Sequence, residues 1–356
     1  MAQIRNRGSN VWYIQIFVGK DDEGKKEFIY ETFYGTKPQA KLYANKIEIE
    51  LKSKGIGPKS VSMTVSDMLN KWLDTIKRRI EKSTYEQYEH HAFKLIELLG
   101  DLQLYSLDSS QIEKRLAQLE NRGLSPRTIK NYYRSLGTAM NWAMEKKLVS
   151  NDVMLGIKPP KIQHVCRKVL KVDELIIFLE TAKEYKHYLP LRILALTGAR
   201  VGEVLGLSWK NVLLDESKIK ISEAINSRCR YLKDTKTKNS KREITLDSET
   251  IQELRNHKTM MAKADKAKDD DYVFQSEDSE FLRYQVIYKA KEKVLKKAGL
   301  HHIRIHDLRH GVGSILLDKG VSITGVAEQL GQVPATTASI YGHALRHGSS
   351  IAGMLD

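Results

Sequence analysis

Two stretches of the sequence decide how its second half is interpreted: LTGARVGEVLGLSW (residues 196–209) and HDLRH (residues 306–310). The first places Arg200 directly after a glycine-containing turn, at the start of a predicted helix. The second places His306 and Arg309 three residues apart, on one face of a helix. Each guanidinium binds two phosphate oxygens at once, and an imidazole adds a further donor. Together these side chains predict a site for one phosphate group.

A third stretch, LGQVPATTASIYGHA (residues 330–344), holds Tyr341 in a short helical segment rich in Ala and Thr. An activated phenol is a nucleophile, so Tyr341 is a candidate for attack on that phosphate. Taken singly, each residue has an ordinary explanation: Arg200 as a helix-capping or surface residue, His306 and Arg309 as a satisfied pair on a helix, and Tyr341 as a core or surface residue among 16 tyrosines. The combination and its order indicate phosphate chemistry.

The segment around these stretches is mixed in secondary structure. Apolar periodicity predicts helices at residues 173–184, 188–197, 200–207, 248–262, 284–298, 307–319, 322–330 and 334–341. Alternating stretches at residues 218–224, 229–235 and 241–246 predict one three-stranded antiparallel sheet.

The first half of the chain has two further patterns. Aromatic and β-branched stretches at residues 11–19 and 26–35 predict a hairpin, and a helix follows at residues 37–55. Helical periodicity then predicts a compact four-helix unit over residues 64–155. Basic residues of this unit, such as Arg127, lie off its apolar stripe, where a phosphate backbone can meet them.

Two stretches typical of linkers, at Gly57-Pro58 and Pro159-Pro160-Lys161, separate these patterns. The fold class is therefore α+β and multidomain: a small three-stranded sheet plus a helix, a helical bundle, and a mostly helical domain with a small antiparallel sheet. We place the domains at residues 1–58, 62–158 and 166–356.

Charge points to a polyanionic partner. The chain carries 59 Lys and Arg against 44 Asp and Glu, a net charge of +15. The excess is spread as +4, +3 and +8 over residues 1–60, 61–160 and 161–356, so no segment is a basic tail. Nucleic acid is the simplest partner, although charge alone does not choose between DNA, RNA and acidic lipid, or exclude a merely soluble basic surface.

Composition excludes several classes. No run approaches a membrane span, and the polar opening MAQIRNRGSN is no signal peptide. Two cysteines, Cys166 and Cys229, are too few for a disulfide framework and fit a reducing cytoplasm.

Signatures of nucleotide and metal sites are missing too. Neither glycine-rich nucleotide loop is found, so we expect no cofactor and no ATP-driven chemistry. His306 and His310 lie four apart, but the pattern lacks the Glu and the third ligand of a zinc site, and no carboxylate cluster has two-metal spacing. We therefore expect no metal.

The motifs, in this order, closely resemble those of the tyrosine recombinases, and among them the phage-type integrases. That family orders its catalytic residues Arg, Lys, His-x-x-Arg, His or Trp, and Tyr. The matching positions are Arg200, Lys236, His306, Arg309, Gln332 and Tyr341. The resemblance covers the whole chain and implies an arm-type DNA-binding domain, a core-binding domain and a catalytic domain for the three predicted domains.

Two of these positions are special. Gln332 stands where the family has His or Trp; its amide still donates to a phosphate oxygen but brings no charge and no ring, so we expect lower activity or tighter dependence on assembly. Lys236 shares its hairpin with Lys233, Lys238 and Lys241, and only alignment of its Lys-Thr step with the family favours it.

Two further residues are expected to support the site. Glu203, one helical turn after Arg200, is expected to orient that guanidinium. His310 ends the HDLRH motif and is placed beside the catalytic residues.

The resemblance implies a reaction. Tyr341 attacks the scissile phosphate held by Arg200, Arg309 and His306, with His306 accepting or sharing the phenolic proton. Lys236 protonates the leaving 5′ oxygen, and a 3′-phosphotyrosine forms. A 5′-hydroxyl of a partner strand then reverses the step, which needs neither ATP nor metal.

The resemblance also implies partners. These are double-stranded DNA with core-type and arm-type attachment sites, a homotetramer on that DNA, a host DNA-bending protein and an excision factor, all in the cytoplasm of a bacterial host and with no membrane. Three alternatives stay open: a Xer-like dimer resolvase, which generally lacks the amino-terminal domain, a catalytically weak DNA-binding regulator, and a type IB topoisomerase.

Overall fold

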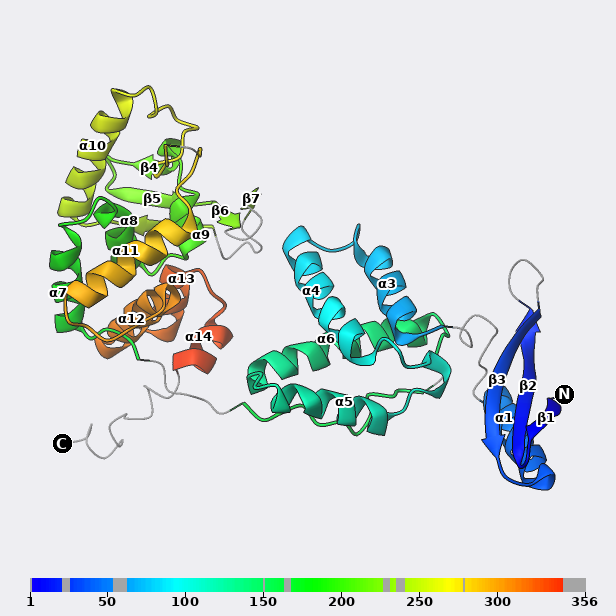
Figure 1. Ribbon diagram of the computed structural model, residues 1–356. Coiled ribbons are helices and arrows are strands. Elements are labelled where there is room, and N and C mark those ends of the chain that lie inside the picture. The colour runs from blue at the N-terminus through cyan, green and yellow to red at the C-terminus, as the bar shows by residue number, and fades with distance from the viewer. Residues whose placement is uncertain are drawn as a thin grey trace, which may run out of the picture. The chain divides into compact units, whose positions relative to one another are not determined.

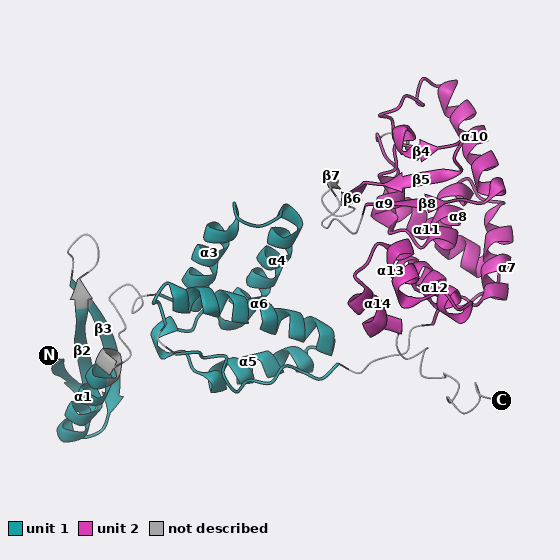
Figure 2. Cartoon of the chain, turned by 180° about the vertical axis from the view of Figure 1, so that it is seen from behind, with its two compact units in different colours: residues 1–164 teal, residues 165–356 magenta. Residues whose placement is uncertain are grey.

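The computed structural model describes residues 2–20, 26–53, 63–149, 151–162, 168–226, 231–234, 241–277 and 279–341. The chain divides into two compact units, residues 1–164 and 165–356 (Figure 2). Among the described residues, no helix is both long enough and apolar enough to cross a membrane.

Unit 1 begins with a three-stranded antiparallel sheet in the order β1-β2-β3, with β1 at Gln3–Gly8, β2 at Val11–Lys20 and β3 at Lys26–Tyr34. Helix α1 (Lys37–Ser53) follows (Figure 1). Alternate residues of β2 and β3 point to the same face, and there Ile14, Ile16 and Ile29 pack with Ala40 and Ala44 of α1. The predicted hairpin and its helix are confirmed.

The rest of unit 1 is a helical bundle. Its helices are α3 (Val65–Ile76), α4 (Lys82–Leu99), α5 (Ser109–Asn121) and α6 (Pro126–Glu145), with a 3₁₀ turn at Leu104–Ser106. They share one core, to which Trp72, Leu95 and Leu136 belong. Ser125 caps α6 by accepting from the Thr128 amide, and Pro126 occupies its first turn. The four predicted helices are thus present.

Unit 2 is mostly helical and has a large core of its own. Its helices are α7 (Val172–Ala182), α8 (Tyr188–Thr197), α9 (Val201–Leu205), α10 (Ser248–Ala262), α11 (Tyr284–Lys297), α12 (Ile305–Asp318), α13 (Ile323–Leu330) and α14 (Pro334–Tyr341), with a 3₁₀ turn at Trp209–Asn211. Helix α8 is buried nearly all round and packs with α7 and α12. Helices α12, α13 and α14 lie together (Figure 1).

The strands of unit 2 correct one prediction. Strands β4 (Val212–Leu213), β5 (Lys218–Ile221) and β8 (Arg242–Thr245) form one antiparallel sheet, and β6 (Glu223–Asn226) pairs with β7 (Tyr231–Asp234) in a separate ribbon. The expected single sheet of three stretches is therefore wrong. The stretch 218–224 is two strands, because β5 pairs with β8 whereas β6 pairs with β7. The α+β, multidomain fold class itself is confirmed.

Candidate active site

Arg200 lies where α8 ends and α9 begins. Gly198 closes α8 in the left-handed conformation, with φ of 66°, and Arg200 is the first residue before α9. Its guanidinium Nη1 donates to Glu203 Oε1 over 2.6 Å, and its backbone N–H donates to Glu203 Oε2 over 2.9 Å. The side chain is 39% exposed, so the oriented guanidinium still faces solvent. Glu203 thus lies as expected beside Arg200.

Glu203 also binds a second arginine, Arg242, which belongs to none of the sequence motifs. Arg242 on β8 donates from Nη2 to Glu203 Oε2 over 2.9 Å, and both side chains are buried. Burial alone raises the pKa of Glu203, but the charge of Arg242 and then that of Arg200 outweigh it, so this pKa is lowered. A signal for Arg242 existed: it shares a strand face with buried Ile244, where an apolar residue is expected.

Arg309 on α12 is 1% exposed. Its Nη1 donates to the carbonyl of Gly198 over 2.7 Å and its Nη2 to that of Leu330 over 2.5 Å. Its Nε has no hydrogen-bond partner among the described residues. Burial, and then the charge of Arg200, lowers the pKa of Arg309 to about 9, so the group stays cationic at neutral pH. A buried cation beside a second cation favours an anionic ligand.

Arg200, Arg242 and Arg309 all donate hydrogen bonds to the carboxyl end of α13. Consecutive carbonyls there accept from different guanidiniums: Gln329 from Arg242 over 2.8 Å, Leu330 from Arg309, and Gly331 from Arg200 over 3.3 Å. Terminal carbonyls lack partners within their own helix and carry the negative end of its dipole. They are therefore well suited to hold cations. We call Arg200, Arg242 and Arg309 the arginine cluster.

Gln332 follows directly on this helix end. Gly331 adopts the left-handed conformation with φ of 60°, and the backbone N–H of Gln332 donates to the carbonyl of Ala327 over 2.8 Å. The side chain is half-buried, and its Oε1 accepts from Thr337 Oγ1 over 3.3 Å. Gln332 therefore lies between the arginine cluster and α14.

Tyr341, the last residue of α14, lies against α12. It is 3% exposed, and its Oη is 3.0 Å from Nδ1 of His310. The rings of His310 and His306 meet edge to face with centroids 4.9 Å apart, and His306 is the exposed member of the pair. Tyr341 contributes to the electrostatic environment of Arg309. The expected nucleophile therefore lies in the same neighbourhood as the expected phosphate ligands.

Lys236 lies outside the described residues, and so does Lys238. Of the other lysines considered for its role, Lys233 is on β7 and Lys241, which is exposed, directly precedes β8. The choice of Lys236 stays a prediction.

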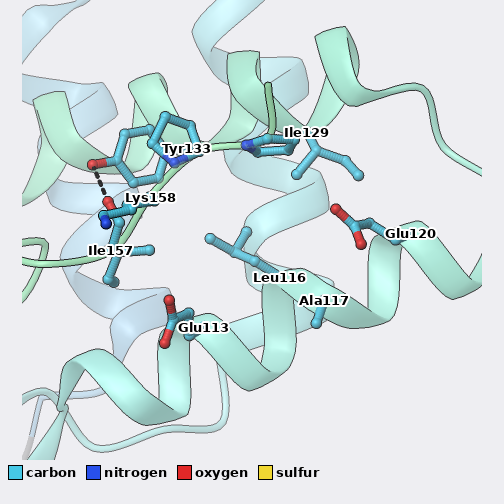
Figure 3. Close-up of a pocket in the computed structure, with 10 residues that line it drawn as sticks. Glu113, Leu116, Ala117, Glu120, Ile129, Tyr133, Ile157 and Lys158 are labelled. Atoms are coloured by element: carbon cyan, nitrogen blue, oxygen red, sulfur yellow. Dashed lines mark hydrogen bonds between the residues drawn. The ribbon is translucent and has the colours of Figure 1, made fainter. Parts of the chain in front are cut away.

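A separate pocket lies in unit 1 between α5 and α6 (Figure 3). It has a volume of about 150 Å³ and is lined by apolar side chains such as Leu116 and by the carboxylates of Glu113 and Glu120. At one side the hydroxyl of Tyr133 donates to the carbonyl of Ile157 over 3.1 Å. None of the predicted site residues lines this pocket.

Comparison with known families agrees with the motifs. Residues 168–347 match the phage integrase family, and residues 64–119 match the phage integrase N-terminal SAM-like domain. The chain belongs to the phage integrase family. It is a tyrosine recombinase of the mobile-element type, and its activity is site-specific DNA recombination, as the motifs predicted.

A similar curated protein is a tyrosine recombinase XerC-like protein of Caldanaerobacter subterraneus, 27% identical over 95% of this chain and 93% of its own. Among solved structures, the Tn1549 transposon integrase in complex with a circular intermediate DNA matches with a TM-score of 0.68 and 20% identity, over 82% of this chain and 97% of that one.

Lambda integrase matches in two solved complexes. A dimer bound to a COC′ core site matches with a TM-score of 0.65 and 18% identity, over 98% of this chain and 97% of that one. A tetramer bound to a Holliday junction matches with a TM-score of 0.61 and 19% identity, over 93% and 95%. These integrases share the fold of this chain.

Proposed function

We propose that this chain is the integrase of a phage or mobile element and that it cleaves and rejoins duplex DNA through a 3′-phosphotyrosine at Tyr341. The observation that carries the proposal is that Arg200 and Arg309 both donate to the end of α13, while Tyr341 contacts His310, the residue next to Arg309. Arg200 and Tyr341, 141 positions apart in the sequence, both lie within electrostatic range of Arg309.

Arg200 and Arg309 bind the scissile phosphate. Their backbone and carboxylate contacts orient both guanidiniums before DNA arrives, and Arg309 keeps Nε unpartnered among the described residues. The attack builds negative charge on the non-bridging oxygens, and cations fixed in advance stabilise that charge without reorganising. Exposed His306 and the amide of Gln332 add donors to the same phosphate.

Tyr341 Oη then bonds to phosphorus while the bond to the 5′ oxygen breaks. The phenolic proton passes to His306, and Lys236 protonates the leaving oxygen. A 5′-hydroxyl of a partner strand attacks the phosphotyrosine and releases Tyr341. Because the phosphodiester energy is kept in the phosphotyrosine, the reaction requires no ATP, and because the guanidiniums supply the positive charge, it requires no metal.

DNA contacts outside the site are assigned to unit 1. On α6, Arg127 and Arg134 are exposed and lie off the buried stripe, where they meet the phosphates of a core-type site. On the sheet face opposite α1, Arg5 and Tyr13 are paired across β1 and β2, and the Arg7 guanidinium lies 4.4 Å from the Tyr13 ring centroid. Because the major groove admits a two-stranded ribbon, we assign this exposed strand face to the major groove of an arm-type site.

The lambda integrase complexes support a dimer or a tetramer on DNA, and we propose a homotetramer here as well. A host DNA-bending protein and an excision factor complete the proposed assembly, which acts on DNA in the bacterial cytoplasm. A Xer-like resolvase is the second candidate, favoured by the XerC-like relative. The sheet and helix of residues 3–53 distinguish this chain from Xer-like proteins that lack such a domain, but not from the XerC-like relative, which matches 95% of this chain.

The test uses the ends of the element that encodes the chain. Their sequenced junction is built into a nicked suicide duplex and incubated with the full chain, EDTA and no nucleotide. We expect a covalent protein–DNA adduct from the wild type and none from Tyr341→Phe, because phenylalanine keeps the ring and lacks the nucleophilic oxygen.

A matched control is Tyr288→Phe, at an exposed position of α11, which is expected to form the adduct at the wild-type rate. No adduct from a wild-type chain that binds the duplex would contradict the proposal and favour a DNA-binding regulator. An adduct that simply reseals the same strand, with no partner-strand product, would favour a topoisomerase.

A further inference from the structure

Two residues of helix α12, His310 and Gly313, form the surface on which the Tyr341 ring packs; we call this surface the Tyr341 seat. His310 is 4% exposed, and its Nδ1 lies 3.0 Å from Tyr341 Oη; the two rings meet with centroids 5.9 Å apart at 61°. One turn on, Gly313 lies directly under the phenol. A Cβ at that position would come within 2.6 Å of both Cζ and Oη of Tyr341.

The seat lies next to a phosphate ligand. His310 follows Arg309 in the sequence, so one rigid helix carries both the guanidinium that donates to the end of α13 and the imidazole that meets the phenol. A displacement needs the attacking oxygen aligned with the phosphorus, and small misplacements of a nucleophile lower the rate strongly. Placing both groups on adjacent residues of α12 fixes one relative to the other.

Resting on the proposed function, we propose that His310 and Gly313 position the nucleophile: His310 orients the Tyr341 hydroxyl through Nδ1, and Gly313 leaves the space in which the phenol lies. His310 is thus a positioning residue that acts through Tyr341. Its role is distinct from that of His306, which is exposed and is assigned to the phosphate in the proposed function. The contact works with either imidazole tautomer, since Nδ1 accepts from the phenol or donates to it.

Two substitutions at His310 separate positioning from packing. His310→Leu fills the space but removes the polar atom, and His310→Asn keeps an amide atom near the place of Nδ1. We expect His310→Leu to slow single-turnover adduct formation at saturating suicide duplex by about tenfold to hundredfold, with an unchanged Kd for DNA. His310→Asn is expected to return the rate to within about threefold of the wild type.

Two glycines on the same helix provide a matched pair. Gly313→Ala places a methyl group against the phenol and is expected to slow the adduct rate by about tenfold or more. Gly311→Ala is expected to leave it unchanged, because a Cβ there has its nearest neighbour 3.6 Å away, at the carbonyl of Leu170. Thermal unfolding of all four variants identifies any that fail to fold.

An independent readout needs no DNA. With 3-fluorotyrosine at position 341 of the full chain, the fluorine resonance is expected to move in His310→Leu and to return toward the wild-type position in His310→Asn. The role of His310 would be overturned by a fluorine resonance that is identical in the wild type and both His310 variants. It would also be overturned by an unchanged adduct rate in His310→Leu, or by equal slowing in His310→Leu and His310→Asn. Absence of adduct from the wild type, with the resonance still shifting, would instead overturn the proposed function and leave the contact standing.

Discussion

The arginine cluster and the Tyr341 seat differ in how they are held. The cluster is tied by charge-assisted bonds to buried Glu203 and to backbone carbonyls at the ends of α8 and α13. The seat is an imidazole, a glycine and ring packing, beneath a tyrosine at the last residue of an eight-residue helix. The arginine cluster is thus held by several bonds within the fold, whereas Tyr341 is held by its side-chain contact with His310 and by packing.

This difference has a chemical reason. The phosphate ligands must be oriented before DNA arrives, because reorganising them during the attack costs rate. The tyrosine must leave its seat to form a bond and return after release. A single side-chain hydrogen bond orients the hydroxyl and is weak enough to break, typically about 0.5–1.5 kcal/mol net. Substitutions in the cluster are therefore expected to have larger effects than those in the seat.

The largest effect is expected from Arg309→Lys. An ammonium keeps the charge but cannot donate to two carbonyls and a phosphate in a fixed fork. We expect single-turnover adduct formation to fall by about 10³-fold, more than for His310→Leu. Lys319→Arg, at the exposed end of the same helix, is the control. An Arg309→Lys rate within tenfold of the wild type would contradict the expected difference between the arginine cluster and the Tyr341 seat.

Glu203→Gln tests the core of the cluster. Removing this charge leaves Arg242 buried without its counter-ion, so the free energy of unfolding is expected to fall by about 3 kcal/mol in urea at pH 7. Glu243→Gln, which removes an exposed carboxylate paired with Lys218 on the same sheet, is expected to leave the midpoint nearly unchanged.

The effect of Glu203 depends on pH in a defined direction. Its pKa is lower in the folded chain than the ordinary value of 4.5, so its contribution is complete above that value and is lost as the pH falls through the folded pKa. The difference between wild type and Glu203→Gln is therefore expected to be constant around neutrality and to shrink in acid. A difference that grew below pH 4.5 would contradict the ion pair.

Gly331→Ala tests the helix end that binds the cluster. Alanine is strained at φ of 60°, and its Cβ would come within 2.6 Å of Arg242 Nη1, which other contacts hold in place. We expect a loss of about 2 kcal/mol in unfolding free energy. Gly320→Ala, left-handed as well but with nothing within 4 Å, is expected to lose only about 1 kcal/mol. Equal losses would mean that the cluster tolerates displacement of Arg242.

The smallest effect is expected at the boundary between the arginine cluster and the Tyr341 seat. Gln332→His restores a ring and a titratable donor two residues before α14, so the adduct rate is expected to rise a few-fold. Single-turnover rates at saturating duplex measure this. A rate that is unchanged or lower would show that glutamine fully performs the role of the family's His or Trp.

Much of the fold was predictable because its signals are local. Apolar periodicity located the helices of both units, and Ser125-Pro126 marked the start of α6. Arg200, His306, Arg309 and Tyr341 were found from short motifs in a fixed order. Motifs of this kind can be recognised in the sequence because each is confined to one turn or one helix.

The remaining features depend on long-range pairing. Arg242 meets Glu203 from 39 residues away, and His310 meets Tyr341 from 31 residues away. The same limit explains the misassigned sheet. An alternating stretch predicts a strand, but its pairing partner depends on packing in the core. In the structure Ile219 of β5 pairs with Ile244 of β8, and β6 pairs with β7.

The most direct test of the central claim is the identity of the residue that carries DNA. The adduct on the suicide duplex is digested with nuclease and trypsin and sequenced by mass spectrometry. The proposed chemistry predicts a nucleotide on the fragment Gly320–Arg346, whose only tyrosine is Tyr341. A nucleotide on any other residue, or cleaved DNA with no modified peptide, would contradict it.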